Sequence, residues 1–238
     1  MQCALRLHLG LPLSLSATRC HRCRAPLDAL GYHLLTCMRT GRVHARHKDL
    51  LQVWRQVFVE AGGRVPRRNV ERLLRNSNVR IEERLQRRLD LVVTGTGSVP
   101  LLCDVTCVSP VSGNGAARSG ASSQEGAVVE AAQRHCHNVD YPEVRRSRAG
   151  RLYSLGVEVF GRWSSDAQRV VRDLARGCVR GLPQRVQLST HTKLLRRWWG
   201  LLGLGVQRVV ASSLLRDTGF DLDTTALEPP PLVADLPC

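Results

Sequence analysis

The clearest chemical signal in the sequence is the stretch CHRCRAPLDALGYHLLTC at residues 20–37, which contains three cysteines and two histidines. Cys20 and Cys23 are separated by two residues, a spacing that suits a tight turn with both thiolates on one metal ion. His33 and Cys37 are separated by three residues, so a helix would place them on the same face, one turn apart. Sulfur and nitrogen ligands at these spacings are typical of a closed structural zinc site, which leaves no position for a reacting water.

The alternatives to zinc are a disulfide pair, or unrelated buried thiols beside one exposed histidine. His21 is a competing ligand, but it lies inside the Cys-x-x-Cys turn and is sterically worse placed.

The nine cysteines are odd in number and follow no disulfide-like framework, which indicates a reducing compartment and hence the nucleus or cytoplasm. The N-terminal MQCALRLHLGLPLSLSA contains arginine and serine but no acid, which leaves a mitochondrial presequence open. No apolar run approaches the roughly 18 residues that a membrane span needs.

Two aspartates inside apolar stretches form a second candidate site. Asp90 lies in RRLDLVV and Asp104 lies in LLCDVTCV. A buried carboxylate is costly unless it is paired or bound to a metal ion. On adjacent strands, two such carboxylates can converge on one Mg²⁺, which polarises a phosphodiester and activates a water. The alternative is that an arginine at position 87 or 88 neutralises one aspartate for purely structural reasons.

The charge of the chain indicates a polyanionic partner. The 238 residues include 35 lysines and arginines against 20 acids, a formal net charge of +15. Nucleic acid is the commonest partner of so basic a protein, and we expect DNA, with RNA as an alternative. Only Lys48 and Lys193 are lysines, so the arginine excess could also reflect a GC-rich gene. A row of arginines, either solvated or facing phosphates, follows one side of a predicted helix: Arg169, Arg172, Arg176 and Arg180.

Apolar periodicity predicts a mixed α/β domain. The pattern predicts helices over 44–61, 124–138 and 164–181, the last with a serine cap, and two further helices within 184–216. Strands are predicted over 87–93, 101–110 and 152–161, with TGTGSVP connecting the first two as a hairpin.

The motifs, in their order along residues 4–216, resemble the C-terminal part of certain non-LTR retrotransposon proteins. The matching pieces are LRLHLGLPL, CHRC…HLLTC, RVHARHKDLL, RRLDLVV, CDVTCVSPV, YPEV and VEVFGRW. In that family a reverse transcriptase is followed by a Cys-Cys-His-Cys knuckle and a restriction-like endonuclease of the PD-(D/E)xK type. The resemblance therefore implies a restriction-endonuclease-like fold and Mg²⁺-dependent cleavage of DNA. Because no polymerase sequence precedes the knuckle, it also implies a detached C-terminal segment.

The resemblance assigns Asp90 and Asp104 as the ligands of the catalytic metal ion. The usual motif has a lysine two residues after the second acid, where this chain has Thr106. In the retrotransposon family that lysine precedes a tyrosine by four residues; counting back from Tyr141 gives His137. A neutral histidine can act as a base near neutral pH, so the departure weakens the expectation of catalysis without removing it.

The remaining candidates have mainly structural interpretations. Glu60 and Glu158 are secondary carboxylates, and the Trp198-Trp199 pair is expected to pack helices rather than to stack bases. Surface or helix-packing roles are expected for four histidines: His44, His47, His135 and His191.

These expectations divide the chain into four parts: a zinc knuckle segment (1–43), a restriction-endonuclease-like core (44–163), C-terminal helices (164–216) and a disordered acidic tail (217–238). Three functions remain open. The chain could be a metal-dependent DNA endonuclease module, a non-catalytic zinc-containing remnant that binds nucleic acid, or a zinc module that binds proteins.

Overall fold

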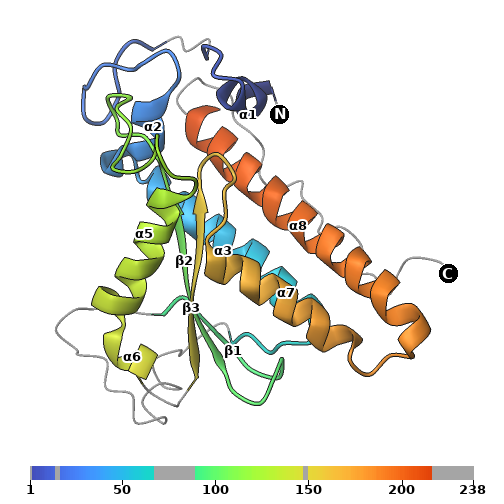
Figure 1. Cartoon of the computed structure of the whole chain (residues 1–238). Coiled ribbons are helices and arrows are strands. Elements are labelled where there is room, and N and C mark those ends of the chain that lie inside the picture. Colours follow the sequence, from blue (N-terminus) through green and yellow to red (C-terminus); the bar gives the residue numbers. More distant parts are fainter. Residues whose placement is uncertain (1, 14–16, 67–88, 147–149, 216–238) are drawn as a thin grey trace.

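A computed structural model describes residues 2–13, 17–66, 89–146 and 150–215, and within them the chain forms a mixed α/β structure (Figure 1). The acidic tail predicted over 217–238 lies outside the described residues. The three strands are β1 (Leu91–Val93), β2 (Leu101–Val108) and β3 (Arg151–Glu158), in the sheet order β1-β2-β3. β1 runs antiparallel to β2, and β2 runs parallel to β3. The predicted hairpin and the third strand are therefore confirmed.

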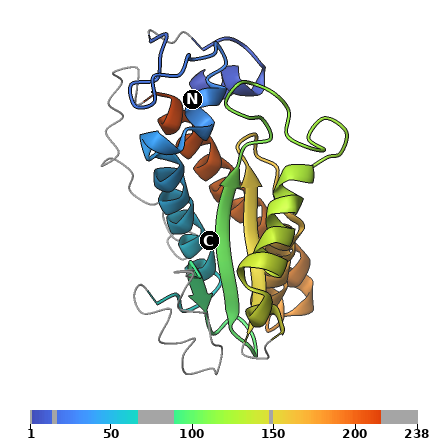
Figure 2. The same ribbon diagram turned by 90° about the vertical axis from the view of Figure 1, so that its left-hand side faces the viewer.

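Helices cover both faces of this small sheet. One face carries α5 (Ala127–His135), the π-helical turn η3 (Cys136–Asp140) and α6 (Pro142–Arg146). The other face packs against α3 (Arg42–Glu60) and α7 (Ser165–Val179), and α8 (Gln184–Leu215) packs against these two helices. Figure 2 shows the sheet between α5 and α3, with the N-terminal segment at one end. That segment contains α1 (Gln2–His8), α2 (Tyr32–Thr36) and η1 (Met38–Thr40).

The serine cap predicted for the helix after β3 is confirmed. Ser164 precedes α7, and its hydroxyl accepts a hydrogen bond from the backbone N–H of Ala167 at 3.3 Å. Such a cap contributes about 1 kcal/mol, since it satisfies one of the helix's unpaired amides. Buried apolar residues then recur along the inner face of α7 and pack under the sheet: Val170, Val171, Leu174 and Ala175.

The prediction of two helices within 184–216 is wrong, because the structure has one continuous helix, α8, over Gln184–Leu215. Its glycines do not break the helix, and one of them allows close packing. A Cβ atom added at Gly205 would lie 2.9 Å from a methyl carbon of Val53, so glycine at this position lets α8 approach α3. Trp198 is fully buried, and its indole N–H donates to Glu60 at 3.0 Å. The helix-packing role expected for Trp198 is thereby confirmed.

One cluster of buried side chains connects the N-terminal segment, α3, the sheet, α7 and α8. Leu34 and Leu35 of α2 belong to it, and each is at most 1% exposed. The cysteine-rich segment is thus anchored to the core through α2, and a change in its structure reaches the packing of α8.

Candidate metal centre and carboxylate pair

The ligand atoms of Cys20, Cys23, His33 and Cys37 lie within 4.8 Å of one another. The Sγ atoms of Cys23 and Cys37 are 3.7 Å apart, and Cys23 Sγ is 3.1 Å from His33 Nε2. Tetrahedral zinc with Zn–S bonds of about 2.3 Å requires sulfurs about 3.8 Å apart, so the donors fit a zinc ion. Among the described residues this is the one group of three or more potential ligands that is so compact. It could therefore hold a metal ion such as zinc, as the spacing predicted.

Backbone hydrogen bonds build this site from two short pieces. In the Cys-x-x-Cys turn, Cys20 N–H donates to Ala25 O and Arg24 N–H donates to Cys20 O, with Arg24 in the left-handed region at φ 62°. On the other side, the carboxylate of Asp28 accepts hydrogen bonds from three backbone amides, including that of His33 at 2.9 Å. These bonds fix the start of α2, and α2 carries His33 one turn before Cys37.

The turn also prepares the cysteines to bind a metal. Burial acts to raise the pKa of Cys20, but hydrogen bonds from the backbone of Cys23 and Arg22 and from His33 lower it to about 6. Burial raises the pKa of Cys37, and the nearby thiols raise it further. Mutual repulsion between thiolates is what a bound cation relieves, so the cluster gains stability on binding zinc. Every cysteine whose bonding the structure describes is a free thiol.

The carboxylate pair comes from the hairpin register. Leu91 pairs with Cys103 and Val92 pairs with Leu102, so the same register places Asp90 opposite Asp104, one residue beyond the end of β1. Both side chains therefore belong to the sheet face covered by α5 and η3. The antiparallel register brings together the two aspartates that the sequence singled out.

The side chains of Asp90 and His47 bind the backbone of β2 just beyond the end of β1. Because β1 begins at Leu91, Val105 has no partner residue in β1, and side chains bind its backbone instead. Asp90 Oδ2 accepts from Val105 N–H at 2.8 Å, and His47 Nδ1 lies 2.9 Å from Val105 O. The ring's other nitrogen, Nε2, lies 3.1 Å from Asp90 Oδ1. Both ring nitrogens thus face acceptors, and the hydrogen bond to Asp90 raises the pKa of His47.

Asp104 lies in an environment that disfavours the charged form of its side chain. Burial raises the pKa of Asp104 to about 7, and the negative charge of Asp90 adds to that effect. The hydroxyl of Tyr141 lies 3.4 Å from Asp104 Oδ1. Tyr141 follows the π-helical turn η3, and its own N–H donates to Cys136 O. Burial and the neighbouring carboxylate both raise the electrostatic free energy of an ionised Asp104. A divalent cation bound between the two carboxylates would lower it.

We expect Asp104→Asn to stabilise the protein in the absence of divalent metal ions. Since the folded-state pKa of Asp104 is above its unfolded value of 3.8, the folded protein binds more protons between the two values, and its stability falls as pH rises through them. Asparagine removes that cost, which reaches at most about 4 kcal/mol at pH 8 and falls below half of that at pH 5. Urea unfolding at both pH values measures the difference. Asp49→Asn, at an exposed position of α3, is the control and should show no such pH dependence.

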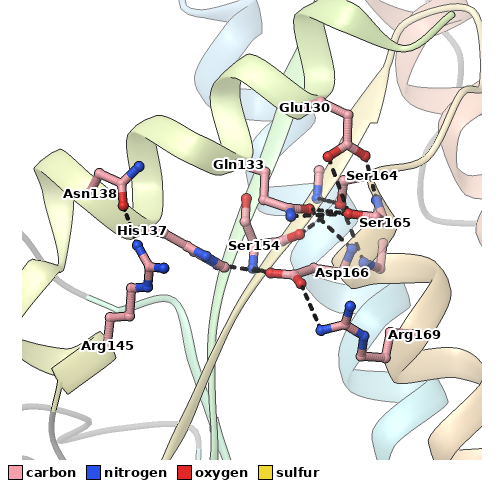
Figure 3. A network of polar contacts seen from close by, with 12 residues as sticks. Glu130, Gln133, His137, Asn138, Arg145, Ser154, Ser164, Ser165, Asp166 and Arg169 are labelled. Carbon is pink, nitrogen blue, oxygen red and sulfur yellow. Dashed lines mark hydrogen bonds and ion pairs between the residues drawn. The ribbon is translucent and has the colours of Figure 1, made fainter.

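His137 lies at a different network, shown in Figure 3. Its Nε2 atom is 2.8 Å from Oδ2 of Asp166, and the same oxygen accepts a hydrogen bond from Ser154 N–H at 3.0 Å. The side chain of Asp166 is only 4% exposed, so His137 supplies a partner for a buried carboxylate. The structure thus brings Asp90, Asp104 and Tyr141 together. The side chain of His137 instead contacts Asp166 of α7.

The secondary carboxylates have structural partners. Glu60 accepts two hydrogen bonds from Arg197 at 2.9 Å and one from Trp198, which joins α3 to α8. Glu158 accepts from Val129 N–H at the start of α5. Neither residue has a contact to the carboxylate pair in the described structure. His47 was expected to have a surface or packing role, but its ring contacts Asp90 and Val105. It is therefore a site residue that was not recognised from the sequence pattern.

None of the helices in the described part of the chain is long and apolar enough to cross a membrane. No protein-family model matches the chain, and no curated protein matches it either. The site geometry and the charge of the chain are therefore the grounds on which a function is assigned.

Proposed function

We propose that the chain is a zinc-stabilised, DNA-binding nuclease module of the restriction-like type, derived from a non-LTR retrotransposon, in which Asp90 and Asp104 hold a catalytic Mg²⁺. The observation that carries this proposal is a pair of carboxylates held opposite each other at the end of a hairpin in a chain of net charge +15. So basic a chain has many cations available, yet the direct partner of Asp90 is a histidine and that of Asp104 is a tyrosine. The order helix, hairpin, helix, parallel strand supports a restriction-like core.

In this proposal the residues around the carboxylates divide the work of phosphodiester hydrolysis. Magnesium bound at Asp90 and Asp104 would supply Lewis-acid polarisation of the phosphate and an activated water. His47 holds Asp90 in place, and in its protonated form it carries a positive charge beside Asp90, where the family motif uses a lysine for charge stabilisation. Tyr141 orients Asp104. His137 has a positioning role through Asp166 on α7.

A second function is favoured by one specific feature. Both oxygens of Asp90 already accept hydrogen bonds, from His47 and from Val105, and no third carboxylate or imidazole completes a compact ligand group with the pair among the described residues. A non-catalytic remnant that keeps its zinc and binds nucleic acid, DNA or RNA, fits that feature. The two candidates share nucleic-acid binding and differ in metal-dependent cleavage.

Binding of duplex DNA should weaken steeply as salt rises from 50 to 200 mM. Contacts between arginines and phosphates release counterions, so the slope of log affinity against log salt should be several units, about −0.9 for each phosphate bound. Fluorescence anisotropy with two unrelated duplexes of equal length measures the slope and should show little sequence discrimination. Absence of binding at 50 mM salt, or an affinity that does not respond to salt, would contradict both candidates.

His47→Ala should weaken Mn²⁺ binding by about 10- to 100-fold, the usual effect of removing a hydrogen-bond partner of a metal ligand. Calorimetric titration of the zinc-loaded protein with Mn²⁺ measures the change. His44→Ala is the matched control, because His44 is exposed and lies on the same helix three residues earlier. Equal Mn²⁺ affinity in the two variants would show that His47 does not support a metal site.

A further inference from the structure

A cavity of about 470 Å³ with a mixed polar and apolar lining lies between the β1–β2 connection and the C-terminal half of α7. It belongs to the opposite side of the sheet from the carboxylate pair. Tyr153 lines it and pairs in register with Cys103, whereas Asp104 pairs with Ser154 on the other face. The cavity is therefore separate from the proposed catalytic site, and its size is that of a site for a small ligand or a nucleotide.

Three arginines surround this cavity: Arg151, Arg176 and Arg180. Arg176 forms an ion pair with Asp173, also in the lining, at 3.1 Å. Arg151 and Arg180 form no ion pair with any residue in the described part of the chain. Two guanidinium groups thus face one space with their charges uncompensated, and a guanidinium fork matches the oxygens of a phosphate.

Two residues of the lining, Thr96 and Tyr153, also carry hydroxyl groups. Thr96 Oγ1 is buried and forms no hydrogen bond with the described residues. Tyr153 is 7% exposed, and its hydroxyl, unlike that of Thr96, is not among the fully buried polar atoms that lack a partner. A buried hydroxyl without a partner costs stability, so its retention calls for an explanation. An oxyanion in the cavity would accept from the accessible Tyr153 hydroxyl and from the arginines, and it would lie next to the buried Thr96 hydroxyl.

We infer that this cavity binds a phosphate group, and that the phosphate belongs to the backbone of the nucleic acid that the protein binds. The assignment of the source rests on the proposed nucleic-acid binding, whereas the phosphate site itself stands on the cavity. Asp173 restricts the position of the anion to the side of Arg151 and Arg180, because Asp173 already neutralises Arg176.

The first test uses inorganic phosphate and the zinc-loaded full chain. At constant ionic strength, phosphate at ten times its half-saturating concentration should raise the melting temperature by roughly 3–6 °C relative to chloride. Arg151→Ala/Arg180→Ala should lose most of that shift. Tyr153→Phe removes a single oxygen and should fold normally, yet it should also reduce the shift. Absence of a shift in the wild type, or an equal shift in all three proteins, would overturn the phosphate site.

The second test identifies the source of the phosphate. In duplex DNA binding, Arg151→Ala/Arg180→Ala should lower the salt slope by about 0.9, the value for one lost phosphate. Arg196→Ala/Arg208→Ala removes the same charge from exposed positions on α8 and should leave the slope unchanged. If phosphate protects the wild type while both double variants keep the wild-type slope, the site binds free phosphate and the nucleic-acid source is wrong. Failure of the wild type to bind DNA at all concerns the proposed function and leaves the melting result to decide the phosphate site.

Discussion

Replacing Cys23 with serine should reduce the zinc content of the purified protein from about one ion per chain to nearly none. Cys23 is the centre of the cluster, since its sulfur contacts both His33 and Cys37. Serine is a poor zinc ligand, and three remaining donors bind zinc far more weakly than four. Elemental analysis of protein purified without added zinc measures the change.

The same substitution should unfold at least residues 18–40. Structural zinc contributes roughly 10–16 kcal/mol of folding free energy in small zinc-binding segments, which exceeds the net stability of most domains. Because Leu34 and Leu35 are buried in the main core, loss of α2 should also lower the melting temperature of the whole chain. Limited proteolysis should locate new cleavage sites within residues 18–40.

Cys178→Ser provides the matched control. Cys178 is a free, partly buried thiol whose Sγ contacts Ala61 O at 3.7 Å, far in sequence from the cluster. This variant should keep its zinc and its resistance to protease. A Cys23→Ser protein that retains one zinc ion per chain, or one that loses zinc and remains as resistant as the wild type, would contradict a structural zinc site.

Most of the elements and the cysteine cluster could be predicted because each depends on local sequence. The zinc ligands have fixed spacings within 18 residues, and the strand around Asp104 is mostly apolar. The hairpin that carries Asp90 and Asp104 was also predicted from neighbouring segments, and its observed register places the two residues opposite each other. In all of these features the residues that contact one another are close together in the sequence.

Contacts over long sequence separations could not be predicted in the same way. His137 meets Asp166 and His47 meets Asp90 only because helices pack on particular faces of the sheet. A signal for His47 did exist: it precedes Leu50 by three residues and Trp54 by seven, so it shares their buried face. The helix α8 continues through Gly205, which packs closely against Val53, and composition alone does not distinguish such a glycine from a helix break.

Metal-dependent DNA nicking should depend on the carboxylate pair Asp90 and Asp104. If the site is catalytic, Asp104→Asn should abolish Mg²⁺- or Mn²⁺-dependent nicking of supercoiled plasmid. A catalytic metal ion contributes several kcal/mol of transition-state stabilisation, and each 1.4 kcal/mol is a factor of ten, so the loss should be on the order of a thousandfold. The affinity for DNA should remain within about threefold, because Asp104 contributes a metal ligand and no phosphate contact.

The effect of Asp104→Asn on stability distinguishes loss of a catalytic group from misfolding. The Asp104→Asn variant that loses nicking should be the more stable protein at pH 8 without metal, since it no longer carries a buried carboxylate with a pKa of about 7. Misfolding would lower both quantities, so opposite changes in activity and stability identify a functional carboxylate. Asp49→Asn, the same substitution at an exposed site on α3, should change neither. If wild-type protein with full zinc shows no nicking that EDTA abolishes, the catalytic proposal fails and the nucleic-acid-binding remnant is the function that the geometry supports.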